Sequence, residues 1–103
     1  MKSRPKIDFK AINSAALAQL PALCAHWLPG GRRRGHEYVA RNPRREDRRA
    51  GSFSINLETG RWADFAVGAR GGDPVSLAAY LSGLGQADAA RRLAEMLGVR
   101  HER

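Results

Sequence analysis

The sequence predicts an α+β domain in which a small antiparallel sheet lies between two helical segments. Apolar residues recur at helical spacing over residues 7–29 and 73–98, and they alternate at period two within residues 35–67. The chain of 103 residues is long enough for one modest core and too short for two. We therefore expect one domain over residues 7–98, with a disordered basic tail at 1–6 and a C-terminal tail or linker at 99–103.

The N-terminal segment, residues 7–29, is expected to form two short helices. Apolar residues follow helical spacing from Phe9 to Trp27. Pro21 has no backbone N–H, so we expect it near the start of a second helix rather than inside one long helix. Cys24 is the single cysteine and cannot form an intramolecular disulfide. Because it lies within the apolar pattern, we interpret it as a small core residue rather than a reactive thiol.

The middle of the chain is expected to form a strand at about residues 36–41 followed by a β-hairpin. Phe53, Ile55 and Leu57 alternate with polar residues, which is typical of a half-buried strand. Glu58-Thr59-Gly60 is interpreted as a three-residue turn with Gly60 at positive φ.

This turn length sets the expected pairing of the hairpin. The predicted facing pairs are Leu57 with Arg61, Ile55 with Ala63, and Phe53 with Phe65. The same register places Trp62 and Asp64 on the polar face, beside Ser54 and Asn56. A large aromatic ring is therefore expected on an otherwise polar sheet surface. The alternative is that Trp62 packs under a helix, as tryptophan on a small sheet commonly does.

Residues 73–98 are expected to form two further helices. Asp73-Pro74 provides an N-cap and a proline at the first helical position. Gly83-Leu84-Gly85 separates the two helices, and Gly98 ends the second one. The predicted apolar stripes are Val75, Leu77, Ala78 and Leu81 in the first helix and Ala89, Ala90, Leu93, Met96 and Leu97 in the second.

The charge of the chain points to a polyanionic partner, of which nucleic acid is the commonest inside cells. Lys and Arg number 18 against 10 Asp and Glu, giving a net charge of +8, and 15 of the basic residues are Arg. Eight arginines lie between Gly31 and Ala50, namely Arg32, Arg33, Arg34, Arg41, Arg44, Arg45, Arg48 and Arg49. We interpret this segment as a phosphate clamp, with Trp62 offering a ring for base stacking. A solvated loop that only maintains solubility is the alternative.

A glycine-rich segment, residues 68–73, precedes the first C-terminal helix. Helix N-termini bind anions, but no Gly-Lys-Ser/Thr follows and Asp73 would repel a phosphate placed there. We therefore interpret the segment as a plain strand-to-helix connection, from which Arg70 can still reach a backbone phosphate.

The sequence contains no residue pattern that indicates catalysis or metal binding. His26, His36 and His101 are scattered, and one cysteine cannot complete a tetrahedral zinc site. We expect a non-catalytic module without a cofactor. No apolar run approaches the ~20 residues of a membrane span, and the N-terminus lacks the apolar region of a signal peptide. A cytoplasmic location with no membrane contact is expected.

Residues 38–99 resemble the N-terminal zinc-binding domain of bacterial and phage DNA primases. The motifs that carry the resemblance are Ser52-Phe53-Ser54-Ile55-Asn56, Thr59-Gly60-Arg61-Trp62, Gly71-Gly72-Asp73 before a helix, and the closing stretch 89–98. The nearest version looks like the leading domain of primase–helicase proteins of proteobacterial plasmids, prophages and integrated elements, which have a strand like Tyr38–Pro43. The resemblance implies a zinc-ribbon-like hairpin with one or two more strands and flanking helices. It also implies contact with single-stranded template or a neighbouring primase domain, and places catalysis in a separate domain.

The family's metal ligands are missing from this chain. In zinc-binding primases a Cys-Pro-x-His pair and a Cys-x-x-Cys pair hold the metal. Asn42 and Arg45 stand where the resemblance implies the first pair, and Asp64 and Val67 where it implies the second. A structural zinc contributes roughly 10 kcal/mol or more to folding, so other contacts must replace it. We expect a metal-free fold stabilised by Phe53, Ile55, Phe65 and the helical stripes; a stoichiometric bound zinc would contradict this.

Two functional hypotheses follow, and a third stays open. The first is binding of single-stranded DNA or RNA by the Arg-rich segment and the polar sheet face, in replication of a mobile element or phage. The second is a protein-interaction module that docks onto a primase, helicase or other replication protein, which an apolar patch at the C-terminal helices would favour. A small regulatory protein of a mobile element that inhibits a host system is neither supported nor excluded.

Overall fold

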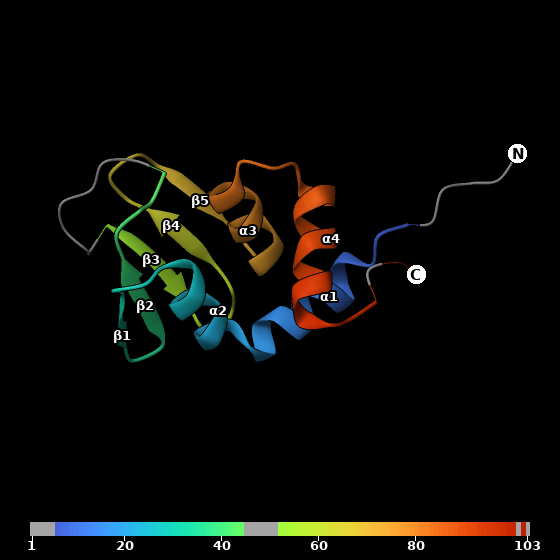
Figure 1. The fold of residues 1–103 in the computed structure, drawn as a ribbon. Helices are drawn as coiled ribbons and strands as arrows, with labels where there is room; N and C mark the ends of the chain where they lie inside the picture. Colours follow the sequence, from blue (N-terminus) through green and yellow to red (C-terminus); the bar gives the residue numbers. More distant parts are fainter. Residues whose placement is uncertain (1–5, 45–51, 101, 103) are drawn as a thin grey trace, which may run out of the picture.

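The computed structural model describes residues 6–44, 52–100 and 102 (Figure 1). Within these residues the chain forms four helices and one antiparallel sheet of five strands, which confirms the α+β class. The elements are α1 (Phe9–Ala18), α2 (Leu20–Trp27), β1 (Arg32–Arg34), β2 (Glu37–Ala40), β3 (Phe53–Asn56), β4 (Trp62–Asp64), β5 (Ala69–Gly71), α3 (Pro74–Ser82) and α4 (Gln86–Leu97).

Local signals set the helix ends as the sequence predicts. Pro21 lies in the first turn of α2, directly after the break that separates it from α1. The Asp73 carboxylate accepts a hydrogen bond from the Ser76 backbone N–H at 2.8 Å, and the Ser76 hydroxyl closes a capping box with the Asp73 backbone. Gly98 ends α4 in the left-handed conformation, with φ of 69°.

The five strands follow chain order in the sheet, β1-β2-β3-β4-β5, and each pairs antiparallel with the next. The strand expected at about residues 36–41 is β2, and the expected hairpin is β3–β4. The strands β1 and β5 were not expected. The glycine-rich segment 68–73 is therefore not a plain connection, because Ala69–Gly71 pairs along β4 and forms one edge of the sheet.

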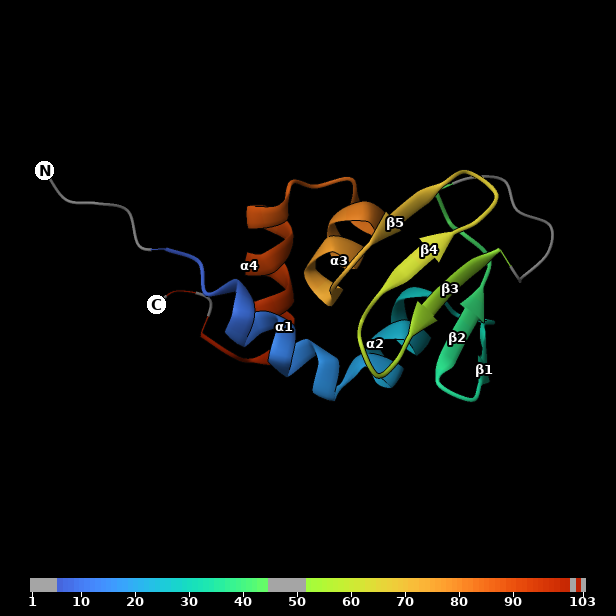
Figure 2. The same ribbon diagram turned by 180° about the vertical axis from the view of Figure 1, so that it is seen from behind.

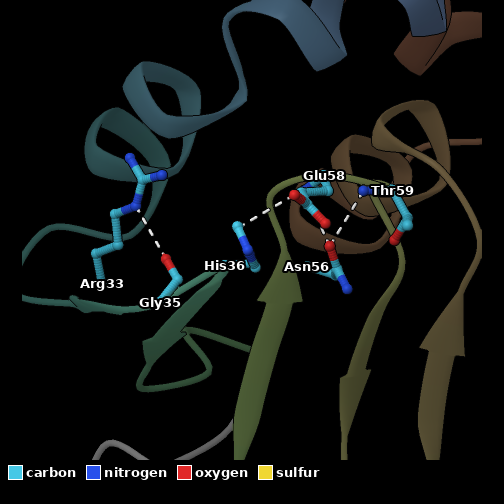
Figure 3. A network of polar contacts seen from close by, with 6 residues as sticks. All are labelled: Arg33, Gly35, His36, Asn56, Glu58 and Thr59. Atoms are coloured by element: carbon cyan, nitrogen blue, oxygen red, sulfur yellow. Dashed lines mark hydrogen bonds and ion pairs between the residues drawn. The ribbon is translucent and has the colours of Figure 1, made fainter.

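The register of the β3–β4 hairpin differs from the prediction by one residue. Ile55 faces Trp62, Ser54 faces Ala63 and Phe53 faces Asp64, because the connecting loop has four residues and not three. The Asn56 side-chain oxygen accepts hydrogen bonds from the backbone N–H groups of Glu58 and Thr59 at 2.9 and 3.1 Å (Figure 3). Asn56 thus belongs to the turn, and its backbone pairs with Arg61. Gly60 takes the expected positive φ of 80°.

Contacts between neighbouring turns tie the sheet together at this end. The His36 imidazole lies 3.3 Å from the Glu58 carboxylate, which joins the β1–β2 turn to the β3–β4 turn (Figure 3). In the β1–β2 turn, the Arg33 side chain donates to the Gly35 carbonyl at 3.1 Å. The Leu57 backbone N–H also donates to the His36 carbonyl at 2.7 Å, which directs the Leu57 side chain into the core.

The helices lie against one face of the sheet and leave the other face open. The side chains of Tyr38, Phe53, Ile55 and Trp62 point to the helical side and are buried. The Tyr38 hydroxyl donates to the Leu28 carbonyl at 2.7 Å, which fastens the end of α2 to β2. The view from behind shows the open face, with no helix of the described chain across it (Figure 2). We call this surface the open face below.

Two expected core residues lie at the surface. Phe65 is 76% exposed because the shifted register turns it away from the core, and Met96 is 51% exposed on α4. Neither contributes the burial that we expected to compensate for the absent zinc. Trp62 contributes instead, and so does Ile12 of α1, because α1 packs on both α3 and α4.

Candidate nucleic-acid interface

The open face carries a row of residues that crosses all five strands. In cross-strand order the row is Arg32, Val39, Ser54, Ala63 and Arg70. The two edge strands thus present a guanidinium group on either side of a centre built of small and medium side chains. Four strand spacings of ~4.8 Å separate the edges, so the two arginine backbones lie about 19 Å apart.

Further basic side chains flank this row. Arg34 pairs with Glu37 between β1 and β2. Arg61 pairs with Asn56 at the loop end of the β3–β4 hairpin, where the Asn56 backbone N–H donates to the Arg61 carbonyl. Arg41 lines a hollow at the β1 edge of the sheet together with all three arginines of β1 and with Val39. Glu37 is the one acidic side chain among the described residues of this surface, and it accepts a hydrogen bond from the Ser54 hydroxyl.

Five arginines of the open face have no partner within the described part of the chain. The guanidinium groups of Arg32, Arg34, Arg41, Arg61 and Arg70 make neither an ion pair nor a side-chain hydrogen bond with any described residue. All five are exposed. Their planar donor groups are therefore available for an external anion, and a phosphate oxygen suits their bidentate geometry.

The aromatic ring of the open face belongs to Phe65. The prediction that Phe65 lies in the core is therefore wrong. The Phe65 backbone N–H donates to the Ser52 carbonyl at 2.9 Å, so the residue continues β4 in register. Its side chain lines the same shallow hollow as Ser54, Ala63 and Arg70. A four-residue loop assigned from the Asn56 turn signal would have placed this ring correctly.

The expected stacking role of Trp62 is wrong, because its indole is buried with 5% exposure. The ring lies edge-on to Phe53 at 6.1 Å between centroids and tilted against Tyr80 at 4.8 Å. The indole N–H donates to the Ser76 hydroxyl at 2.9 Å, which satisfies its hydrogen-bonding requirement inside the core. The alternative interpretation is correct: Trp62 packs under a helix, α3.

A buried polar network connects the ends of two strands, β2 and β4, to α3. Asn42 and Asp64 are the buried polar or charged side chains of the described chain, with 1% and 0% exposure. The Asn42 amide donates to Asp64 at 2.7 Å and to the Tyr80 hydroxyl at 2.8 Å. Asp64 also accepts from the Ala66 backbone N–H at 3.0 Å, which shapes the β4–β5 turn. The network therefore links the end of β2, the end of β4 and α3.

This network occupies two of the four positions that the resemblance assigns to metal ligands. Asn42 and Asp64 meet, whereas Val67 points outward with 56% exposure, and Arg45 lies outside the described residues. Among the residues that the structure describes, no three His, Cys, Asp or Glu side chains come close enough to hold a metal ion. A direct hydrogen bond between Asn42 and Asp64 thus connects the end of β2 to the end of β4.

The remaining predicted arginines divide into three groups. Arg33 lies on β1 opposite Tyr38, so its side chain starts on the helical side of the sheet edge and bonds the Gly35 carbonyl. Arg44 follows the buried network and its guanidinium donates to the Tyr80 carbonyl at 2.6 Å. Arg45, Arg48 and Arg49 lie outside the described residues.

Comparison with models of known protein families gives no match, and no curated protein sequence matches the chain. None of the described helices has the length and apolar character needed to cross a bilayer.

Proposed function

We propose that this protein is a non-catalytic module that binds single-stranded nucleic acid on the open face of its sheet. The observation that carries the proposal is the row from Arg32 to Arg70. Its guanidinium groups on the two edge strands have no partner among the described residues, and Phe65 lies exposed beside it. This combination of basic groups for phosphates and an aromatic face for bases is the general basis of sequence-tolerant single-strand binding.

The centre of the open face supports single strands over duplexes. Ser54 and Ala63 have short side chains, so unstacked bases can approach the sheet closely. The Ser54 hydroxyl oxygen can still accept a hydrogen bond from a base edge, and the Asn56 amide N–H groups can donate one, as polar groups on the exposed sheets of RNA-binding domains do. A duplex also attracts the arginines but keeps its base faces stacked inside, where Phe65 cannot reach them.

The primase-like motifs support a role in replication. By resemblance, the module contacts the template strand on behalf of a primase or helicase of a mobile element or phage, and the catalytic carboxylates lie in a separate domain. DNA is the proposed ligand on this ground, although the open face suits the phosphates and bases of RNA as well.

Fluorescence anisotropy with labelled single-stranded and duplex oligonucleotides across a salt series tests the proposal. Single-strand affinity is expected to fall linearly with salt on a log–log scale, by about 0.7 per phosphate neutralised. The double variant Arg32→Ala/Arg70→Ala should flatten this slope by about 1.4. The matched control Arg91→Ala/Arg92→Ala removes the same charge from α4 and should leave the slope nearly unchanged. Equal effects of the two variants would show that only net charge matters and would overturn the proposed site.

A second candidate function is docking onto a primase, helicase or other replication protein. It is favoured by an apolar groove between α3 and α4, lined by Trp27, Leu81, Leu84, Leu93 and Met96. If the wild type binds no oligonucleotide at low salt, this candidate replaces the first. If docking is the function, Met96→Asp should weaken association with a purified primase or helicase, and the Arg32→Ala/Arg70→Ala variant should not.

A further inference from the structure

The open face continues around the β5 edge into a second groove. Arg70 lines both the hollow over the open face and a groove on the flank of α3. Tyr80, Gly83, Gln86 and Arg44 also line the second groove. No acidic side chain is among the described residues that line it. Two arginines thus line a groove whose described residues include no carboxylate, and Arg70 connects this groove to the open face.

No side chain of Gly72 obstructs the β5 edge between the open face and the second groove. Gly72 follows β5 at this edge, and a side chain placed there would meet no atom of the described residues within 4 Å. The residue also belongs to the hollow over the open face. A ligand strand can therefore pass close to the backbone as it leaves the sheet.

Arg44 is held in position by the buried network. Its backbone N–H donates to the Asn42 side-chain oxygen at 2.8 Å, and its guanidinium donates to the Tyr80 carbonyl at 2.6 Å. The guanidinium carbon also lies 5.4 Å from the centre of the Tyr80 ring. Because Asn42 is itself bonded to Asp64 and to the Tyr80 hydroxyl, the whole arrangement is connected to the core. The side chain is nevertheless exposed, and a guanidinium has five N–H donors, so donors remain for a ligand. Fixing a long side chain in advance reduces the entropy lost on binding.

We propose that a nucleic-acid strand bound on the open face bends around the β5 edge at Arg70, and that Arg44 binds a phosphate beyond the bend. The inference rests on the proposed function and adds a direction and a second subsite to it. A single strand is flexible enough to follow this path. A duplex is not, because its persistence length is about 150 base pairs and bending it sharply costs several kcal/mol. The path therefore selects single-stranded ends or gaps.

The length of the bound strand separates the two subsites. At ~3.4 Å per phosphate of a stacked strand, the roughly 19 Å width of the sheet takes about six nucleotides, and fewer when the strand is extended. We therefore expect Arg44 to contribute only once an oligonucleotide is longer than this. Oligodeoxythymidines of about 4, 6, 8, 10 and 12 nucleotides bracket the limit and lie near the site sizes of known single-strand binders.

The experiment measures the Kd of each oligodeoxythymidine for wild type, Arg44→Ala and the charge-matched control Arg92→Ala. Arg44→Ala should weaken binding of the longest oligomers by about two- to fivefold, as expected for a surface ion pair, and lower their salt slope by about 0.7. It should leave the shortest oligomers and a blunt duplex bound as tightly as by the wild type. Arg92→Ala should change none of these values beyond a uniform small shift. Arg44→Lys keeps the charge and should show an intermediate loss, which provides a second variant if the alanine protein is unstable.

Each result has a distinct meaning. If no oligomer of any length binds, the proposed function itself fails. If oligomers bind but Arg44→Ala has no effect, or weakens short, long and duplex ligands alike, the open face remains the binding site and the path around β5 is wrong.

Discussion

Replacing Phe65 and Trp62 separately with alanine tests the proposal that Phe65 contacts the ligand whereas Trp62 stabilises the fold. The structure gives opposite environments to two aromatic residues that lie three positions apart: Phe65 is 76% exposed and Trp62 is 5% exposed. The two variants should therefore fail in different assays.

The expected magnitudes follow from the buried area. A Phe or Trp side chain has roughly 150–250 Å² to bury, so Phe65 buries about 50 Å² and Trp62 nearly all of its surface. At about 25 cal/mol per Å², Phe65→Ala costs about 1 kcal/mol of stability and Trp62→Ala several times more, within the ~3–5 kcal/mol typical of buried aromatic truncations. Loss of one stacked base costs ~1–3 kcal/mol of binding, so Phe65→Ala should weaken single-strand binding by about 5- to 150-fold.

Urea denaturation followed by tryptophan fluorescence or circular dichroism measures the stability, and anisotropy measures the affinity of folded protein. Phe65→Trp serves as the control because it keeps an aromatic face, and it should retain binding. Unchanged single-strand affinity of Phe65→Ala would remove Phe65 from the site. A stability loss in Phe65→Ala as large as that in Trp62→Ala would contradict the four-residue loop and the register built on it.

Three further predictions concern stability. Asn42→Ala removes the amide that donates to Asp64 and Tyr80 and should lower the free energy of unfolding by roughly 1–3 kcal/mol in urea denaturation; an unchanged midpoint would mean that the network is energetically neutral. Burial raises the pKa of the Cys24 thiol from its ordinary 9.0 to about 12, so above pH 9 the unfolded chain loses a proton that the folded chain keeps. Wild-type stability should therefore fall by about 1.4 kcal/mol per pH unit more steeply than that of Cys24→Ala between these values, and parallel pH profiles would refute the assignment. Asp73→Ala removes the capping box of α3 and should cost about 1 kcal/mol, measured as a drop in Tm of roughly 4–8 °C, whereas Asp88→Ala on α4 should have little effect.

The sequence predicted those parts of the fold whose signals are local. Asp73-Pro74 and Gly98 define helix ends through their own side chains or backbone preferences, and the structure confirms both. Pro21 likewise separates α1 from α2. The strands β2 and β3 also carry their own alternation, with Tyr38, Phe53 and Ile55 directed to the core.

The elements that were missed depend on contacts that no local pattern encodes. Arg32–Arg34 and Ala69–Gly71 contain no alternation of polar and apolar residues, and they become strands only because β2 and β4 offer them a free edge. The register error arose at Asn56, whose side chain closes the turn one residue earlier than a three-residue loop would. That single residue exchanged the faces of Trp62 and Phe65, and with them the identity of the exposed ring.

The position of β1 at the edge of the sheet has a consequence for self-association. A free edge strand exposes unpaired backbone N–H and C=O groups, to which a second copy of the chain could add its own edge. Here that edge consists of three consecutive exposed arginines, Arg32–Arg34. Antiparallel pairing of two such edges would bring six positive charges together, which opposes dimers and fibrils built through this strand. Polyanions neutralise that repulsion, so binding of the ligand proposed for the open face should also weaken this protection against aggregation.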